Sequence, residues 1–415
     1  MLYKIPYGYT YQKIDLDNAT LIDSKINQLS SLTNKSGFEI VREAMDKNPL
    51  YNLAKDAKTC TIILSDHTRP VPSKDIIPNM LHDLRQANSN IDIKLLIATG
   101  FHRKTKKDEL IHKLGQEIVD TEKIIVHDSR DKDSCVDLGN LPSGAPCLVN
   151  KHAINTDLLI AEGFIEPHFF AGFSGGRKSV LPGVCEQTTV LANHNGQFIN
   201  NKFARTGVLD NNPIHIDMVA AAKKANLKYI VNTIIDENKK TVAAFAGDAI
   251  EAHRQGCEFL KEYASVKTKM FDITITGNGG APLDQNVYQA VKCATAAEAT
   301  TKAGGTIIIC AECADGHGGL SFFTKLKDCK NTRELEQEAI KTTMDKTVPD
   351  QWEYQILARI INKCKVIMVT LPEHKKMIED MKMTYAQNIN EALDMINTNN
   401  KTIAIIPNGI SIIID

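Results

Sequence analysis

The chain lacks the features that would direct it to a membrane or to nucleic acid. It contains no apolar run long enough to span a bilayer, and its first residues carry no apolar signal-peptide core. Its 49 basic and 50 acidic residues give a net charge of −1, which provides no electrostatic attraction for nucleic acid or an anionic membrane. We therefore expect a cytoplasmic protein that binds neither.

The chain also lacks a cysteine pattern typical of a metal site or of a disulfide framework. Ten cysteines are scattered along it, and only Cys310 and Cys313 form a C-x-x-C pair. A zinc ribbon needs a second such pair, and a thioredoxin-like redox pair normally opens a helix, whereas ADGHGG follows here. We therefore expect reduced thiols without a metal or redox role.

Alternating strand and helix patterns fill most of the 415 residues, which are too many for one ordinary core. Short apolar runs rich in β-branched residues predict strands buried on both faces, and amphipathic stretches between them predict crossover helices. This alternation predicts two three-layer αβα domains with mostly parallel sheets, residues 1–265 and 266–415, and an active site in the crevice between them.

The predicted strands are 59–66, 93–100, 123–128, 157–163, 228–236, 271–280, 306–312, 365–372 and 402–409. The predicted helices include 75–88, 106–119, 212–226, 249–264, 284–302 and 350–364.

Reactive side chains stand at the ends of several predicted strands. Asp66, Arg69, His102 and His168 each follow such a strand, and ligands of open α/β sheets bind at the carboxyl ends of strands. A carboxylate there can accept ribose hydroxyls, a guanidinium can bind a carboxylate, and histidines can exchange protons near neutral pH. The alternative for Asp66 and Arg69 is a pair that caps the next helix.

The glycine-rich stretch 172–179, GFSGGRKS, resembles a phosphate-binding P-loop but departs from that pattern. The pattern requires glycine directly before the lysine, and Arg177 stands there instead. The backbone amides of Gly172, Gly175 and Gly176 could still hold a mononucleotide phosphate, or the glycines could simply form a tight turn.

The second half contributes a polar pair at the start of a predicted helix. Asp284 is the expected N-cap of helix 284–302, and Gln289 and Lys292 are three residues apart on one face of it. Near a helix N-terminus this pair could bind a small carboxylate. The alternative is a solvated polar face.

Eight segments occur in the same order as in the nickel-dependent lactate racemase family, which the chain resembles over essentially its whole length. These segments are SDHTRPVP, ATGFHR, EGFIEPHFFAGFSGGRKSVLPG, ANHNG, FAGD, PLDQNVYQAVK, DGHGG and PDQW.

The resemblance implies a nickel-pincer nucleotide, that is, nickel(II) pyridinium-3-thioamide-5-thiocarboxylate mononucleotide. One of its two sulfur-bearing arms joins a lysine as a thioamide, and Lys178 matches that lysine. Nickel is bound by the two sulfurs, a ring carbon and one histidine, which His194 matches. The segment Asp66, His67, Thr68 and Arg69 matches contacts to cofactor and substrate.

The resemblance also implies the interconversion of D- and L-lactate. His102 and His168 match two general bases, and Arg69, Gln289 and Lys292 match substrate-binding residues. The C2 hydrogen moves as hydride to the cofactor ring and returns to the other face of a bound pyruvate. The implied ligand is a small 2-hydroxy carboxylate, and the implied partners are the proteins that mature the cofactor.

Three alternatives remain at this point. The first is racemisation or epimerisation of another 2-hydroxy acid with the same cofactor. The second is a zinc or nickel hydrolase with His102, His168 and His194 as ligands, which leaves Lys178 without a role. The third is a non-catalytic nucleotide-binding protein, which has no use for two opposed histidines.

Overall fold

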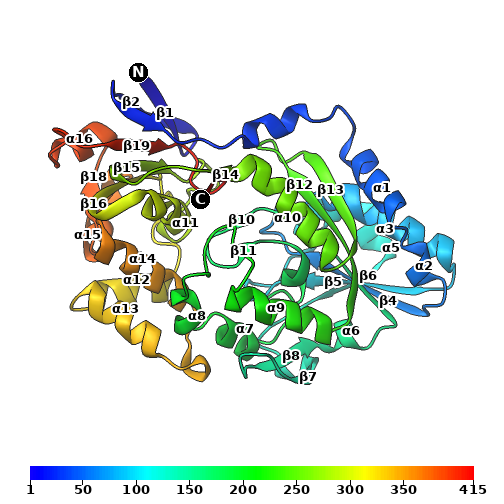
Figure 1. Cartoon of the computed structure of the whole chain (residues 1–415). Coiled ribbons are helices and arrows are strands. Elements are labelled where there is room, and N and C mark those ends of the chain that lie inside the picture. Colours follow the sequence, from blue (N-terminus) through cyan, green and yellow to red (C-terminus); the bar gives the residue numbers. More distant parts are fainter.

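The computed structural model describes residues 1–415 and contains two six-stranded sheets packed against helices (Figure 1). The first sheet has the spatial order β13 (Thr241–Asp248), β12 (Leu227–Ile235), β9 (Leu158–Phe164), β4 (Thr59–Ser65), β5 (Asp92–Ala98) and β6 (Lys123–Val126). All neighbours are parallel except the antiparallel edge strand β13. Helices cover both faces, since α1 (Gly37–Lys47), α3 (Ser73–Ala87) and α4 (Lys107–Leu114) pack on one side, and α7 (Gln187–Asn193) and α9 (Pro213–Lys224) on the other.

The second sheet is parallel throughout. Its order is β18 (Thr384–Ala386), β17 (Lys365–Val369), β16 (Thr301–Cys310), β15 (Phe271–Gly277), β19 (Ile403–Ile406) and β3 (Ala19–Leu21). One face is covered by α11 (Val287–Thr300) and α14 (Gln351–Lys363), and the other by α16 (Ile389–Asp394) and the hairpin of β1 (Leu2–Tyr7) and β2 (Thr10–Asp15). The predicted fold class, two three-layer αβα units with mostly parallel sheets, is confirmed.

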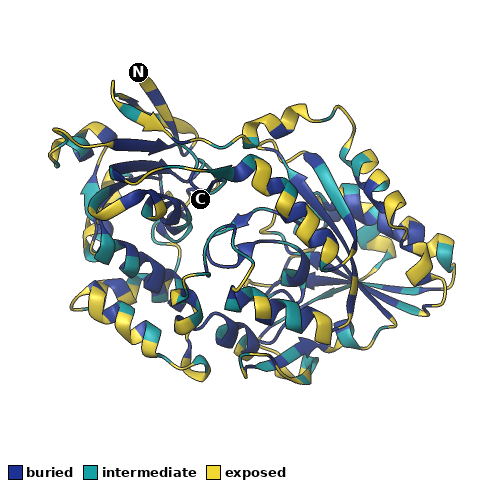
Figure 2. Ribbon diagram, viewed as in Figure 1, coloured by how far each residue is buried: buried dark blue, intermediate teal, exposed yellow.

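The central strands are apolar because they are buried on both faces. Every residue of β9 is buried, including Glu162, and β4 exposes only its ends in part. Figure 2 shows both sheets as dark interiors beneath helices with exposed outer faces. A strand buried on both faces is apolar at successive positions, so these strands could be predicted from continuous apolar runs in the sequence.

The first residues of the chain pack with the second sheet. Strand β3 pairs with β19, and Tyr3 and Ile5 of β1 lie in the core cluster of the second sheet. The predicted first domain, residues 1–265, therefore includes a segment that belongs structurally with the second. Further along, the chain passes from the first sheet to the second between α10 (Glu251–Ala264) and β15. A domain boundary between residues 265 and 266 stays a prediction.

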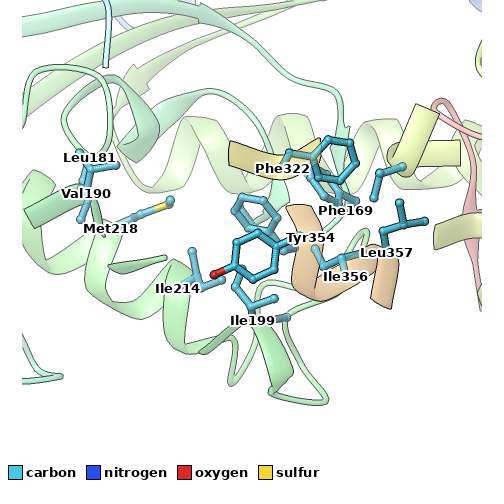
Figure 3. Packing of buried hydrophobic residues seen from close by; sticks show 14 of the residues in the cluster. Phe169, Leu181, Val190, Ile199, Ile214, Met218, Phe322, Tyr354, Ile356 and Leu357 are labelled. Atoms are coloured by element: carbon cyan, nitrogen blue, oxygen red, sulfur yellow. The ribbon is translucent and has the colours of Figure 1, made fainter. Parts of the chain in front are cut away.

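A short helix joins the two halves. Helix α8 (Gly196–Asn200) lies against α13 (Thr332–Lys341) and α14, and the Gln355 side-chain amide donates to the Gly196 carbonyl at 2.8 Å. One apolar cluster spans the junction, with Ile199 and Ile214 near Tyr354 and Ile356 (Figure 3). Residues directly after His194 are thus attached to the second half of the molecule.

No helix in the structure is long and apolar enough to cross a membrane.

The contact between α8 and α13 leaves no room for a side chain at residue 196. We expect Gly196→Ala to reduce the free energy of unfolding by about 1–3 kcal/mol, because its Cβ would overlap the Ala339 carbonyl oxygen. Chemical denaturation measures this. The control Gly319→Ala should cost less, since its nearest neighbours are side-chain atoms at 3.2 Å or more, and equal losses would contradict the prediction.

Candidate active site

The carboxyl ends of β4, β5 and β9 face the N-terminal ends of α11 and α14 across one cavity of about 280 Å³. Eight residues predicted from the sequence line it: Asp66, Arg69, His102, His168, Lys178, His194, Gln289 and Lys292. The strand-end argument covered four of them, Asp66, Arg69, His102 and His168, and the structure brings these together as expected. The other four come from the glycine-rich stretch, the segment around His194 and the polar pair on α11. His67 and Thr68 are not among the lining residues.

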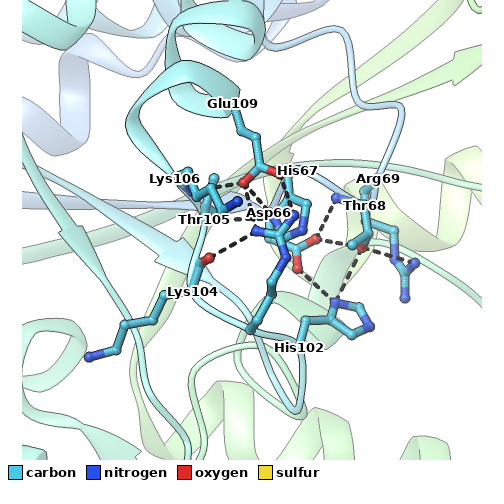
Figure 4. A network of polar contacts seen from close by, with 10 residues as sticks. Asp66, His67, Thr68, Arg69, His102, Lys104, Thr105, Lys106 and Glu109 are labelled. Carbon is cyan, nitrogen blue, oxygen red and sulfur yellow. Dashed lines mark hydrogen bonds and ion pairs between the residues drawn. The ribbon is translucent and has the colours of Figure 1, made fainter. Parts of the chain in front are cut away.

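Asp66 and His102 form a hydrogen-bonded pair at the rim of this cavity (Figure 4). The Nδ1 atom of His102 lies 2.7 Å from Oδ2 of Asp66, and Thr68 donates its hydroxyl to the other carboxylate oxygen at 2.7 Å. Although burial raises the pKa of Asp66, the hydrogen bonds from His102 and Thr68 and the charge of Arg69 lower it overall. An ionised carboxylate only accepts, so Nδ1 of His102 carries a proton, and it is Nε2 that has a lone pair whenever the ring is neutral.

His67 points away from the cavity into a second polar network. Its Nδ1 lies 3.1 Å from the Thr105 hydroxyl and 3.8 Å from Glu109, whose carboxylate also binds Arg103 and accepts from the Lys106 amide (Figure 4). The Arg103 guanidinium and the Lys106 amide lower the pKa of Glu109 to about 2. This network fixes the loop that carries His102.

His168 enters from a small hairpin after β9. It lies in β10 (Pro167–His168), opposite Gly172 of β11 (Gly172–Phe173), and its Nδ1 accepts from the Ala171 amide at 3.3 Å. The ring packs against Phe169 and Phe170, with centroids 5.1 and 4.5 Å away. Burial, and then the charges of nearby lysines, keep the pKa of His168 well below its usual value, so its ring is neutral.

The glycine-rich turn presents Lys178 rather than a phosphate cradle. Gly175 has a φ of +75°, and a Cβ there would overlap Asn232, whose side chain already accepts from the Gly176 amide at 2.7 Å. That amide is therefore not free for a phosphate, so at Gly176 the structure favours the tight turn over the phosphate cradle, the two alternatives left open by the sequence. Burial and the charges of Arg177 and Arg69 hold the pKa of Lys178 well below its usual value.

His194 is held between the two halves of the molecule. Its ring lies edge-on to Phe170 and to Trp352, with both centroids 5.1 Å away. Its Nδ1–H donates to the Val190 carbonyl at 3.1 Å, which leaves the lone pair of Nε2 without a partner. Burial and the charge of Lys178 lower the pKa of His194 to about 3, so the ring stays neutral at physiological pH.

Gln289 and Lys292 lie in the first turns of α11, as predicted, but the helix begins later than expected. Asn286 is its N-cap and accepts from the Gln289 amide at 3.0 Å. Asp284 instead accepts from the amides of Gly8 at 2.7 Å and Glu312 at 3.1 Å, which ties the N-terminal hairpin to this loop. The prediction that Asp284 is the N-cap is therefore wrong, but Gln289 and Lys292 face the cavity as predicted.

Both halves of the chain match domains described from one family. Residues 7–207 match the lactate racemase N-terminal domain, and residues 266–414 match the lactate racemase C-terminal domain. The chain belongs to the lactate racemase family.

Full-length relatives of this family are close in sequence. A lactate racemase of Thermoanaerobacterium thermosaccharolyticum is 49% identical over 420 residues, covering 99% of this chain and 98% of that protein. A lactate racemase of Lactiplantibacillus plantarum is 46% identical over 419 residues, covering 99% of each.

Solved structures agree with the fold. The lactate racemase apoprotein from T. thermosaccharolyticum superposes with a TM-score of 0.96 at 48% identity and full coverage of both chains. A Thermotoga maritima protein shares only the fold, with a TM-score of 0.63 at 18% identity, covering 91% of this chain and 98% of that one.

Several cavity residues of this family member were not assigned from the sequence. Trp352 donates its indole N–H to the Tyr288 hydroxyl at 3.1 Å and lies 6.4 Å from Phe101 between ring centroids. Glu166 and Glu353 also line the cavity, and burial raises the pKa of both carboxyls. Trp352 is the only tryptophan of the chain and stands in PDQW, which was the available signal.

The protein side chains alone do not form a metal site of the hydrolase type. No group of three or more histidine, cysteine or carboxylate side chains is arranged to hold a metal ion. His102, His168 and His194 therefore do not form the three-histidine site that the hydrolase alternative requires. Cys310 and Cys313 are buried free thiols outside the cavity lining, and burial raises the pKa of Cys313 to about 12.

We expect acid to destabilise the apoprotein through histidines buried in the neutral form. His194 and His215 have folded pKa values of about 3, against about 6.5 when unfolded, so only the unfolded state takes up these protons as the pH falls below 6.5. Each ring should cost up to about 1.4 kcal/mol per pH unit in this window.

Urea unfolding at pH 6.5, 5.5 and 4.5 measures this slope. His194→Asn should make the slope shallower by about one proton, whereas His82→Asn, at an exposed helix position, should leave it unchanged. An unaltered slope in His194→Asn would show that His194 is charged in the folded protein.

Proposed function

We propose that this protein interconverts D- and L-lactate by hydride transfer to and from a nickel-pincer nucleotide tethered to Lys178. The observation that carries the proposal is that Lys178, His194, two histidines and a carboxylate-binding group share one cavity in a chain of the lactate racemase family. When bound, the nucleotide supplies a hydride acceptor and donor, so that the substrate passes through pyruvate.

The donor groups of the cavity fit such a cofactor. A single imidazole, His194, offers a free Nε2, and its other nitrogen is fixed by a backbone carbonyl, as in most metal-ligating histidines. Since no cluster of protein ligands accompanies it, the remaining donors would arrive with the nucleotide. Soft sulfur donors with one imidazole suit square-planar nickel(II). The Lys178 amine, whose low pKa favours the uncharged form, suits covalent attachment.

The substrate carboxylate would be bound by Arg69, Gln289 and Lys292. Arg69 comes from the loop after β4, whereas Gln289 and Lys292 come from α11 in residues 266–415. The proposed carboxylate-binding site therefore contains residues of both proposed domains. Burial, and then the charge of Arg69, lower the pKa of Lys292, and a bound carboxylate would restore its preference for the charged form.

His102 and His168 would exchange the hydroxyl proton on the two sides of the substrate. Nε2 of neutral His102 accepts the proton, and Asp66 at Nδ1 stabilises the imidazolium that results. His168, packed between Phe169 and Phe170, acts on the opposite side. Inversion needs both, because the oxygen gains its proton on the side opposite to the one where it was lost.

Aromatic residues around these groups would limit water. Phe101, Phe169, Phe170, Tyr288 and Trp352 contribute to the wall of the cavity. Exclusion of water protects a reactive hydride and strengthens the electrostatic interactions in the site. We further propose that the partners are cofactor-maturation proteins and that the protein acts in the cytoplasm.

Protein produced together with a cofactor-maturation system should carry an adduct on Lys178. It should also contain about one nickel per chain, because His194 is the one proposed nickel ligand of the chain. Intact mass, peptide mapping and metal analysis measure both. Lys178→Ala should lack the adduct, whereas Lys202→Ala, at an exposed position, should retain it. Full activity with an unmodified Lys178 would refute the proposal.

Replacing either general base should abolish racemisation in both directions, because each direction uses both histidines. We expect His102→Ala and His168→Ala each to lose at least about 100-fold in kcat from D- and from L-lactate. Polarimetry with each enantiomer measures the rates, and His82→Ala on the exposed face of α3 serves as control. Near-normal rates in either active-site variant would exclude the two-base mechanism.

A further inference from the structure

Arg177 is a buried cation without an acidic partner. Only 1% of the residue is exposed, and none of the ion pairs in the structure includes it. Burial lowers the pKa of its guanidinium to about 10. An unpaired buried charge is costly unless hydrogen bonds compensate for it, so its surroundings must supply acceptors.

Backbone carbonyls of the glycine-rich turn supply most of these acceptors. Nη2 donates to the Ala171 carbonyl at 2.7 Å, and Nη1 donates to the carbonyls of Phe173 at 2.7 Å and Gly175 at 3.2 Å. Nε donates to Nδ1 of His215 at 3.0 Å. The planar guanidinium thus connects three points of the turn to α9, which carries His215.

The carbonyls that Arg177 binds lie between the two reactive residues of this segment, His168 and Lys178. Ala171 follows the strand that carries His168, and Gly175 precedes the 3₁₀ turn Gly176–Ser179, which carries Lys178. The ring of His253 completes the enclosure, because its Nε2 donates to the Ser174 carbonyl at 2.8 Å and a Cβ at Gly176 would overlap it. These contacts restrict the backbone of the turn and therefore the direction in which the Lys178 side chain points.

We propose that Arg177 is a positioning residue whose guanidinium fixes the turn that presents Lys178 to the cavity and whose charge keeps the Lys178 amine reactive. The proposal rests on the proposed function only for the identity of the group that finally attaches to Lys178. It also explains why arginine stands at the one position where a P-loop would need glycine.

The charges that face Lys178 come from several elements. Arg177 precedes it in the same turn, Arg69 lies in the loop after β4, Lys292 on α11, and Glu166 before β10. The three cations oppose protonation of the amine and Glu166 favours it, while His168 and His194 are neutral rings. Removing the Arg177 charge should therefore raise the pKa of Lys178.

Carbamoylation by cyanate tests this on the full-length apoprotein, without cofactor or lactate. The uncharged amine adds to the carbon of isocyanic acid and an amine proton moves to its nitrogen, which gives a urea with no leaving group. Peptide mass spectrometry from pH 6 to pH 10 gives the rate at each lysine. In the wild type, Lys178 should react at lower pH than the exposed Lys202.

Arg177→Met should move the midpoint of the Lys178 labelling profile to higher pH, so that Lys178 is labelled more slowly than in the wild type at each pH below the wild-type midpoint. Arg177→Gln, which also removes the charge but keeps a side-chain donor for the turn carbonyls, should show the same shift of the midpoint. A matched control is Arg205→Met, since Arg205 is half-buried and donates to the carbonyls of Asn201 at 3.0 Å and Ala204 at 2.8 Å outside the cavity.

An Arg177→Met variant that melts earlier but keeps the wild-type midpoint would reduce Arg177 to a structural role and overturn the proposal. If that variant does not fold, Arg177→Gln decides the question in the same way, because it also removes the charge and can still donate to the turn carbonyls. The labelling needs no racemase activity, so its failure and a failure of the proposed function are distinguishable.

Discussion

Four basic side chains gathered in one enclosed space are the constraint on which the rest of this site depends. Lys178 and Lys292 are half-buried, Arg69 stands at the rim, and Arg177 lies fully buried behind them. Charges of one sign at close range oppose one another strongly when water is scarce. Two features reduce this repulsion: the imidazoles of His168 and His194 are neutral, and the carboxyls of Glu166 and Glu353 line the same cavity. An anionic ligand would complete the balance and stabilise the folded protein.

The fold could be predicted from the sequence where strands are buried on both faces. Strands β4, β5, β9 and β15 carry apolar runs, and the structure places each within a few residues of its predicted range. Strand β16 begins at Thr301, before its predicted start at 306, and its first residues escaped the prediction because they form no apolar run and are partly exposed. The short elements could not be predicted in the same way. Strand β3 has three residues, is largely exposed, and pairs with β19 nearly 400 positions away, so no local pattern assigns it to the second sheet.

The candidate site could be predicted where residues follow strands, because parallel strands bring their carboxyl ends to one edge. His67 and Thr68, which only the family resemblance implied, do not line the cavity, because neighbouring residues of a tight loop point in different directions. Asp66 and Arg69 of this loop face the cavity, whereas His67 contacts Thr105. Trp352 was missed for a different reason. Its position depends on how the second half packs on the first, which the spacing within one helix does not reveal.

The attachment of α8 has a mechanical consequence. His194 projects from a linker whose far side is bound through the Gly196 carbonyl to Gln355, while its ring lies between Phe170 of one half and Trp352 of the other. A hinge motion that separates the halves must either break this attachment or carry the imidazole away from Lys178. Opening of the two halves would then also separate the proposed tether, Lys178, from the proposed nickel ligand, His194, so that a cofactor held by both residues would resist the opening.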